Sequence, residues 1–175
     1  MIQIRPAVPA DAPVLAEVAA ATFPLACPPH TSDEAKADFI ARNLSEASFD
    51  AYLADPEREL FVAELDGRLV GYTMLVAGEP ADADVAAAIT TRPTIELSKV
   101  YTLADVHGSG AGGALVAASI AAARARGVAA VWLGVNQENA RANRFYEKNG
   151  FALVGTKRFL VGDRYEDDFV RELVL

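Results

Sequence analysis

The sequence predicts an α/β domain built on a mixed, strongly twisted β-sheet flanked by helices. Helical periodicity dominates the first third of the chain, changes to an alternation of apolar and polar residues near residue 59, and then gives way to strands alternating with helices. The 175 residues are 52% hydrophobic and 23% charged, which suits one domain spanning residues 1–175 with a sizeable core. No internal repeat or low-complexity linker divides the chain.

The N-terminal segment contains a strand followed by a helix. Residues 2–5 alternate in polarity and form the strand, which ends at Pro6. Asp11 is expected to cap a helix that runs to about Thr22, because Pro13 suits the first helical turn. Three prolines within residues 24–31 then predict a loop.

Two further helices and a hairpin follow. Thr31 or Ser32 begins one helix, and Ser45 begins a second that runs to Leu53. Strands at 59–65 and 68–76 are joined by Asp66-Gly67, a sequence typical of a hairpin turn. The acidic, alanine-rich segment 79–92 shows no period that would assign it to an element.

The C-terminal half alternates strands with helices. Gly127 and Asn149-Gly150 are the expected ends of its two helices. The predicted elements, in chain order, are a strand at 95–103, a glycine-rich turn at 108–113, a helix at 111–126, a strand at 128–135, a helix at 139–148 and strands at 151–161 and 169–175.

The charge balance bears on the binding partner. With 24 acidic and 16 basic residues the formal net charge is −8. An acidic domain repels phosphate backbones and attracts small cations, so we expect no nucleic-acid partner. No apolar run reaches the roughly eighteen residues of a membrane span, and the first residues contain no signal-peptide core. We therefore expect a cytoplasmic protein with no membrane partner.

The single cysteine and two histidines argue against a metal site or a disulfide. Cys27 and His30 are separated by a double proline, which is poor geometry for a nucleophile pair, so we interpret Cys27 as a packed thiol. His30 is a candidate pocket residue, and the alternative is an ordinary loop histidine. Four aromatic residues of the helical region are expected to line the same pocket or to pack in the core: Phe23, Phe39, Phe49 and Tyr52.

The segment DVHGSGAGG at 105–113, between a strand and a helix, is the most informative motif. Its glycines allow positive φ and bring backbone N–H groups close to a ligand, and the following helix adds the positive end of its dipole. These features favour a pyrophosphate site. The loop lacks the Lys-Ser/Thr ending of a Walker A motif, and the next strand does not end in the acidic residue of a dinucleotide fold. A flexible turn before an alanine-rich helix is the simpler alternative.

A second motif begins the helix at 139–148. Asn139 is placed to cap this helix, and Ala142 keeps it thin where a ligand could pass. Tyr146 follows two turns later, and a tyrosine hydroxyl, neutral below its pKa of about 10, can protonate a thiolate leaving group. The alternative for Tyr146 is a buried aromatic ring with a satisfied hydroxyl.

Together these motifs resemble the GCN5-related N-acetyltransferase (GNAT) superfamily. The resemblance is also carried by Ile4-Arg5-Pro6-Ala7, by Leu69-Val70-Gly71-Tyr72, by the strand at 96–102 and by the closing hairpin. It implies a single-domain GNAT fold whose central strands, 95–103 and 128–135, splay apart. The cosubstrate would be acetyl-CoA, with its pantetheine arm in the gap between these strands, and no metal would be required.

The resemblance also implies which residues hold acetyl-CoA. Backbone groups of Val100, Tyr101 and Thr102 would pair with the pantetheine arm. Asp105 departs from the family, which usually has glutamine or arginine there. His107 would supply part of the missing positive charge, and the alternative for it is a solvated loop residue. The remaining cofactor-binding residues implied are Gly108, Ser109, Gly110, Ala111, Gly112, Gly113, Asn139 and Tyr146.

The implied chemistry is direct attack of an amine on the thioester. Tyr146 would protonate the departing thiolate, and a backbone N–H near Val100 would stabilise negative charge on the carbonyl oxygen. Glu96 would take the amine's proton through a water, provided that burial raises its pKa. The alternative for Glu96 is a surface residue at a strand end.

Within the superfamily the chain most resembles the PaiA-type spermidine/spermine N-acetyltransferases. The resemblance is carried by residues 95–101, Trp132-Leu133-Gly134-Val135 and residues 155–163, and the acids at 166–168 suit a polycation. A solvated hairpin edge is the alternative for these acids. Other functions left open are acetylation of peptide or protein N-termini or of a xenobiotic amine, and a non-catalytic CoA-binding sensor. A nicotinamide or flavin oxidoreductase is disfavoured by the strand order. The resemblance also makes a homodimer an expectation.

Overall fold

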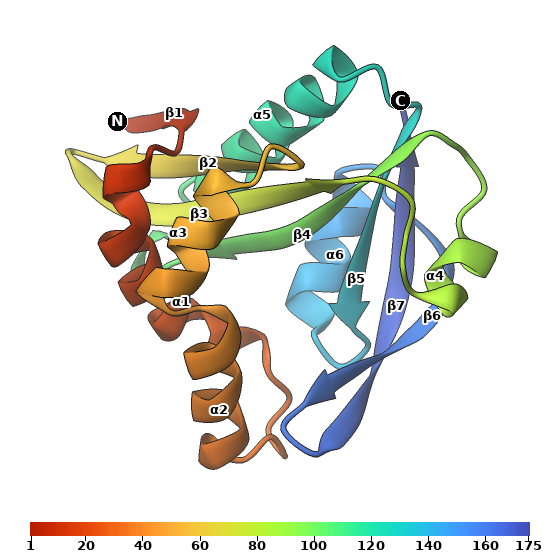
Figure 1. The fold of residues 1–175 in the computed structure, drawn as a ribbon, viewed down its shortest axis with the longest axis horizontal. Coiled ribbons are helices and arrows are strands. Elements are labelled where there is room, and N and C mark those ends of the chain that lie inside the picture. The colour runs from red at the N-terminus through yellow and green to blue at the C-terminus, as the bar shows by residue number, and fades with distance from the viewer.

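A computed structural model describes residues 1–175, in which seven strands form one mixed sheet in the order β1-β2-β3-β4-β5-β7-β6 (Figure 1). All neighbouring strands are antiparallel except β4 and β5, which are parallel. The predicted mixed α/β fold is therefore confirmed. The strands are β1 (Ile2–Pro6), β2 (Arg58–Leu65), β3 (Arg68–Ala77), β4 (Thr94–Thr102), β5 (Ala130–Asn136), β6 (Ala152–Val161) and β7 (Arg164–Val174).

Helices cover both faces of the sheet. Helices α1 and α3 pack over β2 and β3 on one face, whereas α5 and α6 pack on the other face (Figure 1). No helix has the length and apolar character needed to cross a membrane. The helices are α1 (Ala12–Ala26), α2 (Asp33–Asn43), α3 (Glu46–Ala54), α4 (Ala83–Ala88), α5 (Ala111–Ala125) and α6 (Ala140–Lys148), with 3₁₀ turns at Pro9–Asp11 and Ala104–Val106.

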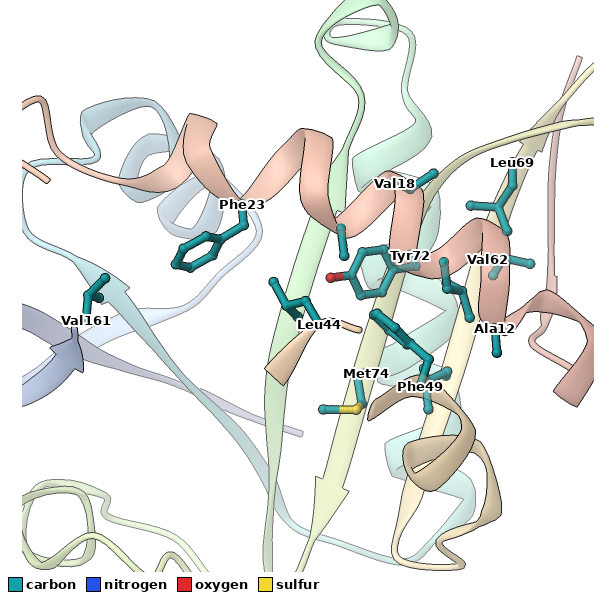
Figure 2. Close-up of a cluster of buried hydrophobic side chains, with 13 residues drawn as sticks. Ala12, Val18, Phe23, Leu44, Phe49, Val62, Leu69, Tyr72, Met74 and Val161 are labelled. Carbon is teal, nitrogen blue, oxygen red and sulfur yellow. The ribbon is translucent and has the colours of Figure 1, made fainter. Parts of the chain in front are cut away.

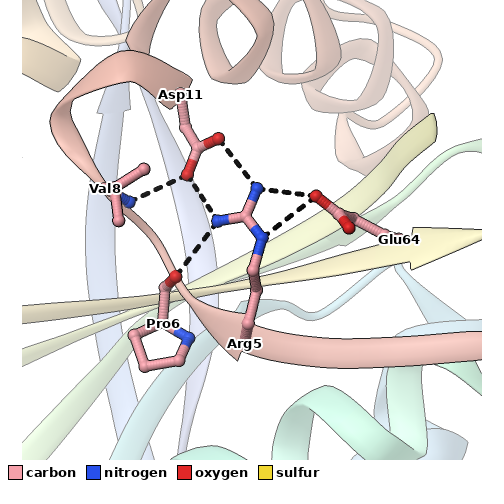
Figure 3. Close-up of polar contacts among 5 residues, drawn as sticks. All are labelled: Arg5, Pro6, Val8, Asp11 and Glu64. Atoms are coloured by element: carbon pink, nitrogen blue, oxygen red, sulfur yellow. Dashed lines mark hydrogen bonds and ion pairs between the residues drawn. The ribbon is translucent and has the colours of Figure 1, made fainter. Parts of the chain in front are cut away.

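The start of α1 differs from the sequence prediction in its chemistry. Asp11 precedes the helix, but its side chain makes no capping hydrogen bond to it. Its carboxylate instead accepts hydrogen bonds from both terminal nitrogens of Arg5, at 2.8 and 2.9 Å, and from the Val8 N–H (Figure 3). Arg5 also donates to Glu64 on β2. Hydrogen bonding from Arg5 lowers the pKa of Asp11. This network ties β1 to the start of α1.

The end of α1 is a second correction. The helix continues through Pro24 to Ala26, so the predicted end at Thr22 and the predicted loop from residue 24 are wrong. Phe23 is buried and stacks on Phe39 of α2, with ring centres 4.4 Å apart. This packing favours the helical path although a proline inside a helix forfeits one backbone hydrogen bond.

Two other boundaries and one further element needed the tertiary structure. Strand β7 begins at Arg164, five residues before the predicted start, because it forms a tight hairpin with β6. Strand β5 begins at Ala130, two residues later than expected. The unassigned segment 79–92 contains α4, which is capped by Asp82.

The apolar core divides between the two faces of the sheet. On the α1 side, Phe49 and Tyr72 meet edge to face with ring centres 5.5 Å apart, inside a cluster of 13 buried residues (Figure 2). On the other side, α5 and α6 pack on β4 and β5 through ten buried residues that include Tyr146. Both clusters abut the central strands, so they fix the position of β4 relative to β5.

The parallel strands β4 and β5 part after three paired residues, as predicted. Pairing begins at Thr94 with Ala130 and ends at Glu96 with Trp132. Beyond this point β4 stays paired with β3 up to Thr102, and β5 stays with β7 (Figure 1). Ser98 is an extra residue in β4, since Lys99 pairs with Met74 and Leu97 with Leu75. One edge of β4, residues 97–102, is left without a strand partner.

Candidate functional site

A cavity of about 430 Å³ opens where β4 and β5 part. Its walls come from these two strands, from α6, from the end of α1 and from the β6–β7 hairpin. The predicted site residues that line it are Glu96, Val100, Tyr101, Thr102, His107, Gly112, Asn139 and Tyr146. The predicted residues that lie outside its wall, in the adjoining turn, are Gly108, Ser109, Gly110, Ala111 and Gly113.

This adjoining turn presents free hydrogen-bond donors. Gly108 and Gly110 have φ of +84° and +92°, which residues with a side chain rarely adopt. The N–H groups of Gly110, Gly112 and Gly113 donate to no acceptor in the chain. The Ala111 N–H is different, because it donates to Ser109 Oγ at 3.3 Å. The turn therefore offers a group of backbone donors suited to an anion.

Asp105, the departure from the family pattern, is paired away from this turn. Its carboxylate accepts a hydrogen bond from Arg68 Nη2 at 2.8 Å, and both side chains are exposed. Nε2 of His107 lies 3.1 Å from the Thr102 carbonyl oxygen and 3.3 Å from Nη1 of Arg141. Arg141 lines the cavity and was not predicted from the sequence. The sequence feature that could have identified Arg141 is its place two residues after the helix cap Asn139.

Asn139 and Tyr146 stand at opposite ends of α6. The Asn139 side chain accepts a hydrogen bond from the Ala142 N–H at 3.2 Å, so its predicted capping role is confirmed. Tyr146 is 8% exposed and packs edge to face between Phe145 and Phe151. Burial raises the pKa of Tyr146, and the nearby Tyr101 adds to the shift. The Tyr146 hydroxyl therefore stays protonated at neutral pH.

Glu96 lies at the last paired position of β4 and lines the cavity. Burial raises its pKa, while the charges of Lys157, Lys99 and Arg58 oppose the shift. Lys99 also lines the cavity, and burial lowers its pKa to about 8. Glu96 is therefore not a fully solvated strand end, and it faces two lysines that sequence analysis did not single out.

The acids of the β6–β7 hairpin are divided between cavity and solvent. Glu166 and Asp168 are 5% and 6% exposed and line the cavity, whereas Asp167 is exposed. Burial raises the pKa of Asp168 to about 6, with Lys157 opposing the shift. The alternation of β7 turns two of the three acids inward. The alternative of a solvated hairpin edge, considered above for all three acids, therefore describes only Asp167.

His30 contacts the cavity wall without lining it. Its Nε2 lies 2.8 Å from both carboxylate oxygens of Glu166, and its Nδ1 lies 3.6 Å from Glu138. These three side chains are the candidates for holding a metal ion, with ligand atoms within 4.8 Å of one another. However, each ring nitrogen faces a different carboxylate, so the imidazole bridges the two acids.

Cys27 lines the cavity together with two of the four predicted helical aromatics. The Cys27 thiol lies against the Phe23 carbonyl oxygen at 3.5 Å, and burial raises its pKa to about 11, so it is packed, not activated. Phe23 and Phe39 line the cavity. Phe49 is a core residue, and Tyr52 donates its hydroxyl hydrogen to the Asn43 carbonyl at 2.7 Å.

Comparison with known proteins agrees with this geometry. The acetyltransferase (GNAT) family model matches residues 20–151. An uncharacterized N-acetyltransferase of Mycobacterium tuberculosis is 49% identical over 166 residues, which cover 94% of this chain and 99% of the relative. This relative spans nearly the whole chain, so the likeness is not confined to the glycine-rich turn.

Two solved structures share the fold. The PaiA N-acetyltransferase of Thermoplasma acidophilum, in complex with coenzyme A, has a TM-score of 0.80 at 20% identity, covering 100% of this chain and 99% of that one. The ribosomal-protein-S18-alanine N-acetyltransferase of Escherichia coli has a TM-score of 0.70 at 20% identity, covering 99% and 94%. Since the family model, the close relative and the splayed sheet agree, this chain is an N-acetyltransferase of the acetyltransferase (GNAT) family.

Proposed function

We propose that the protein transfers the acetyl group of acetyl-CoA to a primary amine of a small cation, with polyamines as the first candidates. The observation that carries this proposal is the cavity at the parting of β4 and β5. It joins an unpaired strand edge, a turn with free N–H groups and the hydroxyl of Tyr146. Residues 1–175 would act as one domain, because both sides of the cavity come from the same sheet.

The residues present fit acetyl-CoA. The unpaired edge at 97–102 offers the backbone groups of Val100 and Thr102 to the amides of the pantetheine arm, whereas those of Tyr101 alternate toward β3. The N–H groups of the turn at 108–113 suit the pyrophosphate, and Arg141 beside His107 supplies positive charge that Asp105 does not. The bound cosubstrate would supply an acetyl thioester open to attack by an amine.

Tyr146 is the proposed acid. Its hydroxyl makes no hydrogen bond within the chain, it lines the cavity, and its raised pKa keeps the proton in place. A group that holds its proton at neutral pH can give it to a thiolate as the thiol leaves. The N–H of Val100, on the unpaired edge, is the proposed donor to the acetyl oxygen.

Glu96 is the proposed base. An alkyl ammonium has a pKa of about 10.4, so the acceptor arrives protonated and must lose a proton before it can attack. Burial raises the pKa of Glu96, which makes it a stronger base than an ordinary glutamate. Its place where β4 and β5 part would put it beside the reacting amine.

The acceptor side supports a cationic substrate. Glu96, Glu166 and Asp168 all line the cavity, and the last two are almost completely buried. Buried carboxylates attract ammonium groups more strongly than exposed ones, because the surrounding dielectric constant is lower. The likeness of the fold to the PaiA N-acetyltransferase adds to this support. Spermidine and spermine are therefore the acceptors that we propose to test first.

The test is release of free thiol from acetyl-CoA against a panel of amines. The panel contains spermidine, spermine, diamines, peptides with free N-termini and aromatic amines. Selective turnover of the polyamines is the expected result. Turnover confined to peptides or aromatic amines would overturn the polyamine proposal and keep the chemistry. Saturable acetyl-CoA binding without thiol release from any amine would contradict the catalytic proposal and favour a CoA-binding sensor.

A pair of neighbouring variants tests the acidic wall. Asp168→Asn removes a buried cavity carboxylate, and Asp167→Asn removes an exposed one from the same strand. We expect the KM for spermidine to rise about tenfold in the first variant and to change little in the second. An equal effect of both would point to the overall charge instead of the cavity.

A cytoplasmic location and a homodimer stay predictions, to be checked by cell fractionation and light scattering.

A further inference from the structure

The chain contains four lysines, and two of them line the cavity. Lys99 and Lys157 contribute to its wall, whereas Lys36 and Lys148 lie elsewhere. The ammonium of Lys157 is not held in an ion pair, and it lies 5.3 Å from the centre of the Phe159 ring. A primary amine of the chain itself is therefore present in the compartment proposed for the acceptor amine.

The position of Lys157 depends on a glycine of the facing strand. A Cβ atom added to Gly134 would lie 2.5 Å from Cε of Lys157, 3.5 Å from its Nζ and 3.5 Å from Oδ2 of Asp168. The missing side chain at 134 thus makes room for a lysine that starts on β6 and passes β7 to reach β5. Gly134 is two residues beyond Trp132, the last residue of β5 that pairs with β4. The lysine amine therefore lies beside the start of the gap.

The charge of this lysine affects the pKa values of two carboxylates. Lys157 is the leading charged group that opposes the raised pKa of Glu96, and it does the same for Asp168. Its ammonium therefore lies close to both the proposed base and the acidic wall. This is the environment proposed above for the ammonium of an external acceptor.

We propose that Lys157 is itself an acetyl acceptor, so that the enzyme acetylates its own cavity. The inference rests on the proposed function, because acetyl-CoA is the donor. The ammonium first loses a proton to Glu96 or to water. A bond then forms between Nζ and the acetyl carbonyl carbon, the bond from that carbon to sulfur breaks, and the second amine proton leaves as the thiol is released. The products are N-acetyl-lysine at position 157 and coenzyme A.

Lys99 is the competing candidate within the cavity. Its pKa is lowered to about 8, so its free amine is more abundant at neutral pH than that of an ordinary lysine. However, its Nζ lies 5.7 Å from the centre of the Tyr52 ring, on the side of α3, and Arg58 contacts the same ring. Lys99 is thus directed toward α3, whereas Lys157 lies against the strand that borders the gap.

Acetylation of Lys157 would have two effects on the cavity. It removes one positive charge from beside Glu96 and Asp168, and it adds an acetamide to the space over Gly134. The added group would compete with an external amine for the same volume. The modified enzyme is therefore expected to turn over an external acceptor more slowly than the unmodified enzyme.

The experiment follows label from isotopically labelled acetyl-CoA into the purified full-length protein by peptide mass spectrometry. Exposed Lys148 serves as the internal control for uncatalysed acetylation. We expect label at Lys157 at least about tenfold faster than at Lys148, at a rate independent of protein concentration, because the amine is held next to the donor. Tyr146→Phe should slow labelling of Lys157 and not that of Lys148. Gly134→Ala, which displaces the lysine, should also slow it.

The outcomes separate this inference from the proposed function. Thiol release with an external amine, but no label at Lys157 in the absence of that amine, would overturn self-acetylation alone. Preferential label at Lys99, or equal label at Lys148 and Lys157, would also overturn it. Failure to bind acetyl-CoA would overturn the proposed function and the inference together. Label at Lys157 in the unmodified protein, together with no new label at Lys99 in Lys157→Arg, would support it.

Discussion

Nε2 of His30 lies 2.8 Å from both carboxylate oxygens of Glu166 and so joins the loop after α1 to strand β7. These two residues are 136 positions apart in the sequence. The same loop region brings Cys27 and Pro28 to the cavity wall, to which Glu166 also belongs. A contact between segments far apart in the sequence thus borders the side of the cavity proposed for the acceptor amine.

Replacing Tyr146 with phenylalanine should lower kcat with little change in acetyl-CoA affinity. The variant keeps the ring that packs between Phe145 and Phe151 and loses only the proposed acid. Loss of one general acid lowers kcat by about 10²- to 10⁴-fold. Steady-state thiol release and calorimetric titration with CoA measure the two quantities. An unchanged kcat would remove Tyr146 from the mechanism.

Replacing Glu96 with glutamine should change the pH dependence of the reaction. A base acts in its deprotonated form, so kcat/KM of the unmodified enzyme should rise as the pH increases through the pKa of Glu96. Burial raises that pKa, so the increase in kcat/KM should occur at higher pH than it would for an ordinary glutamate. Glu96→Gln should lose this limb, while Glu147→Gln, an exposed change on α6, should keep it. A limb that persists in Glu96→Gln would assign the base to another group.

Replacing Arg141 with alanine should weaken binding of CoA about three- to tenfold at low ionic strength, because an exposed cation contributes modestly and is screened by salt. Arg144→Ala provides the matched control, since Arg144 lies on the same helix and does not line the cavity. Pantetheine, which has no phosphates, should bind both variants equally. Weaker pantetheine binding to Arg141→Ala would instead indicate a local structural change.

Replacing Phe49 with alanine should destabilise the fold. Phe49 is fully buried and contacts the ring of Tyr72 edge to face (Figure 2). It contacts the ring of Tyr52 in the same way. Truncation of a buried phenylalanine lowers the free energy of unfolding by about 3–5 kcal/mol. Urea denaturation followed by circular dichroism measures the change. Val14→Ala, at a site 41% exposed, should change it far less. Similar losses in both variants would contradict the assigned core.

Local sequence rules predicted those features that depend on interactions within a few residues of the chain. The Asp66-Gly67 hairpin has positive φ at both residues, as that turn type requires. Ser32 and Ser45 cap their helices, accepting hydrogen bonds from the backbone three residues on. The rules failed at Asp11 and at the end of α1. At these places a partner in another element, Arg5 of β1 or Phe39 of α2, outweighs the local preference.

The sequence by itself determined the fold class, through the succession of helical and strand periodicities along the chain. It also determined the glycine-rich turn and the helix that carries Tyr146, because these two depend on backbone geometry within a few residues. Only the tertiary structure decided which charged side chains enter the cavity. Strand alternation indicates that Asp167 and Asp168 face opposite ways, but not which of them faces the cavity. The placement of Lys157 over Gly134 likewise depends on β6 lying beyond β7. Such contacts arise from the order of strands in space, which no local pattern encodes.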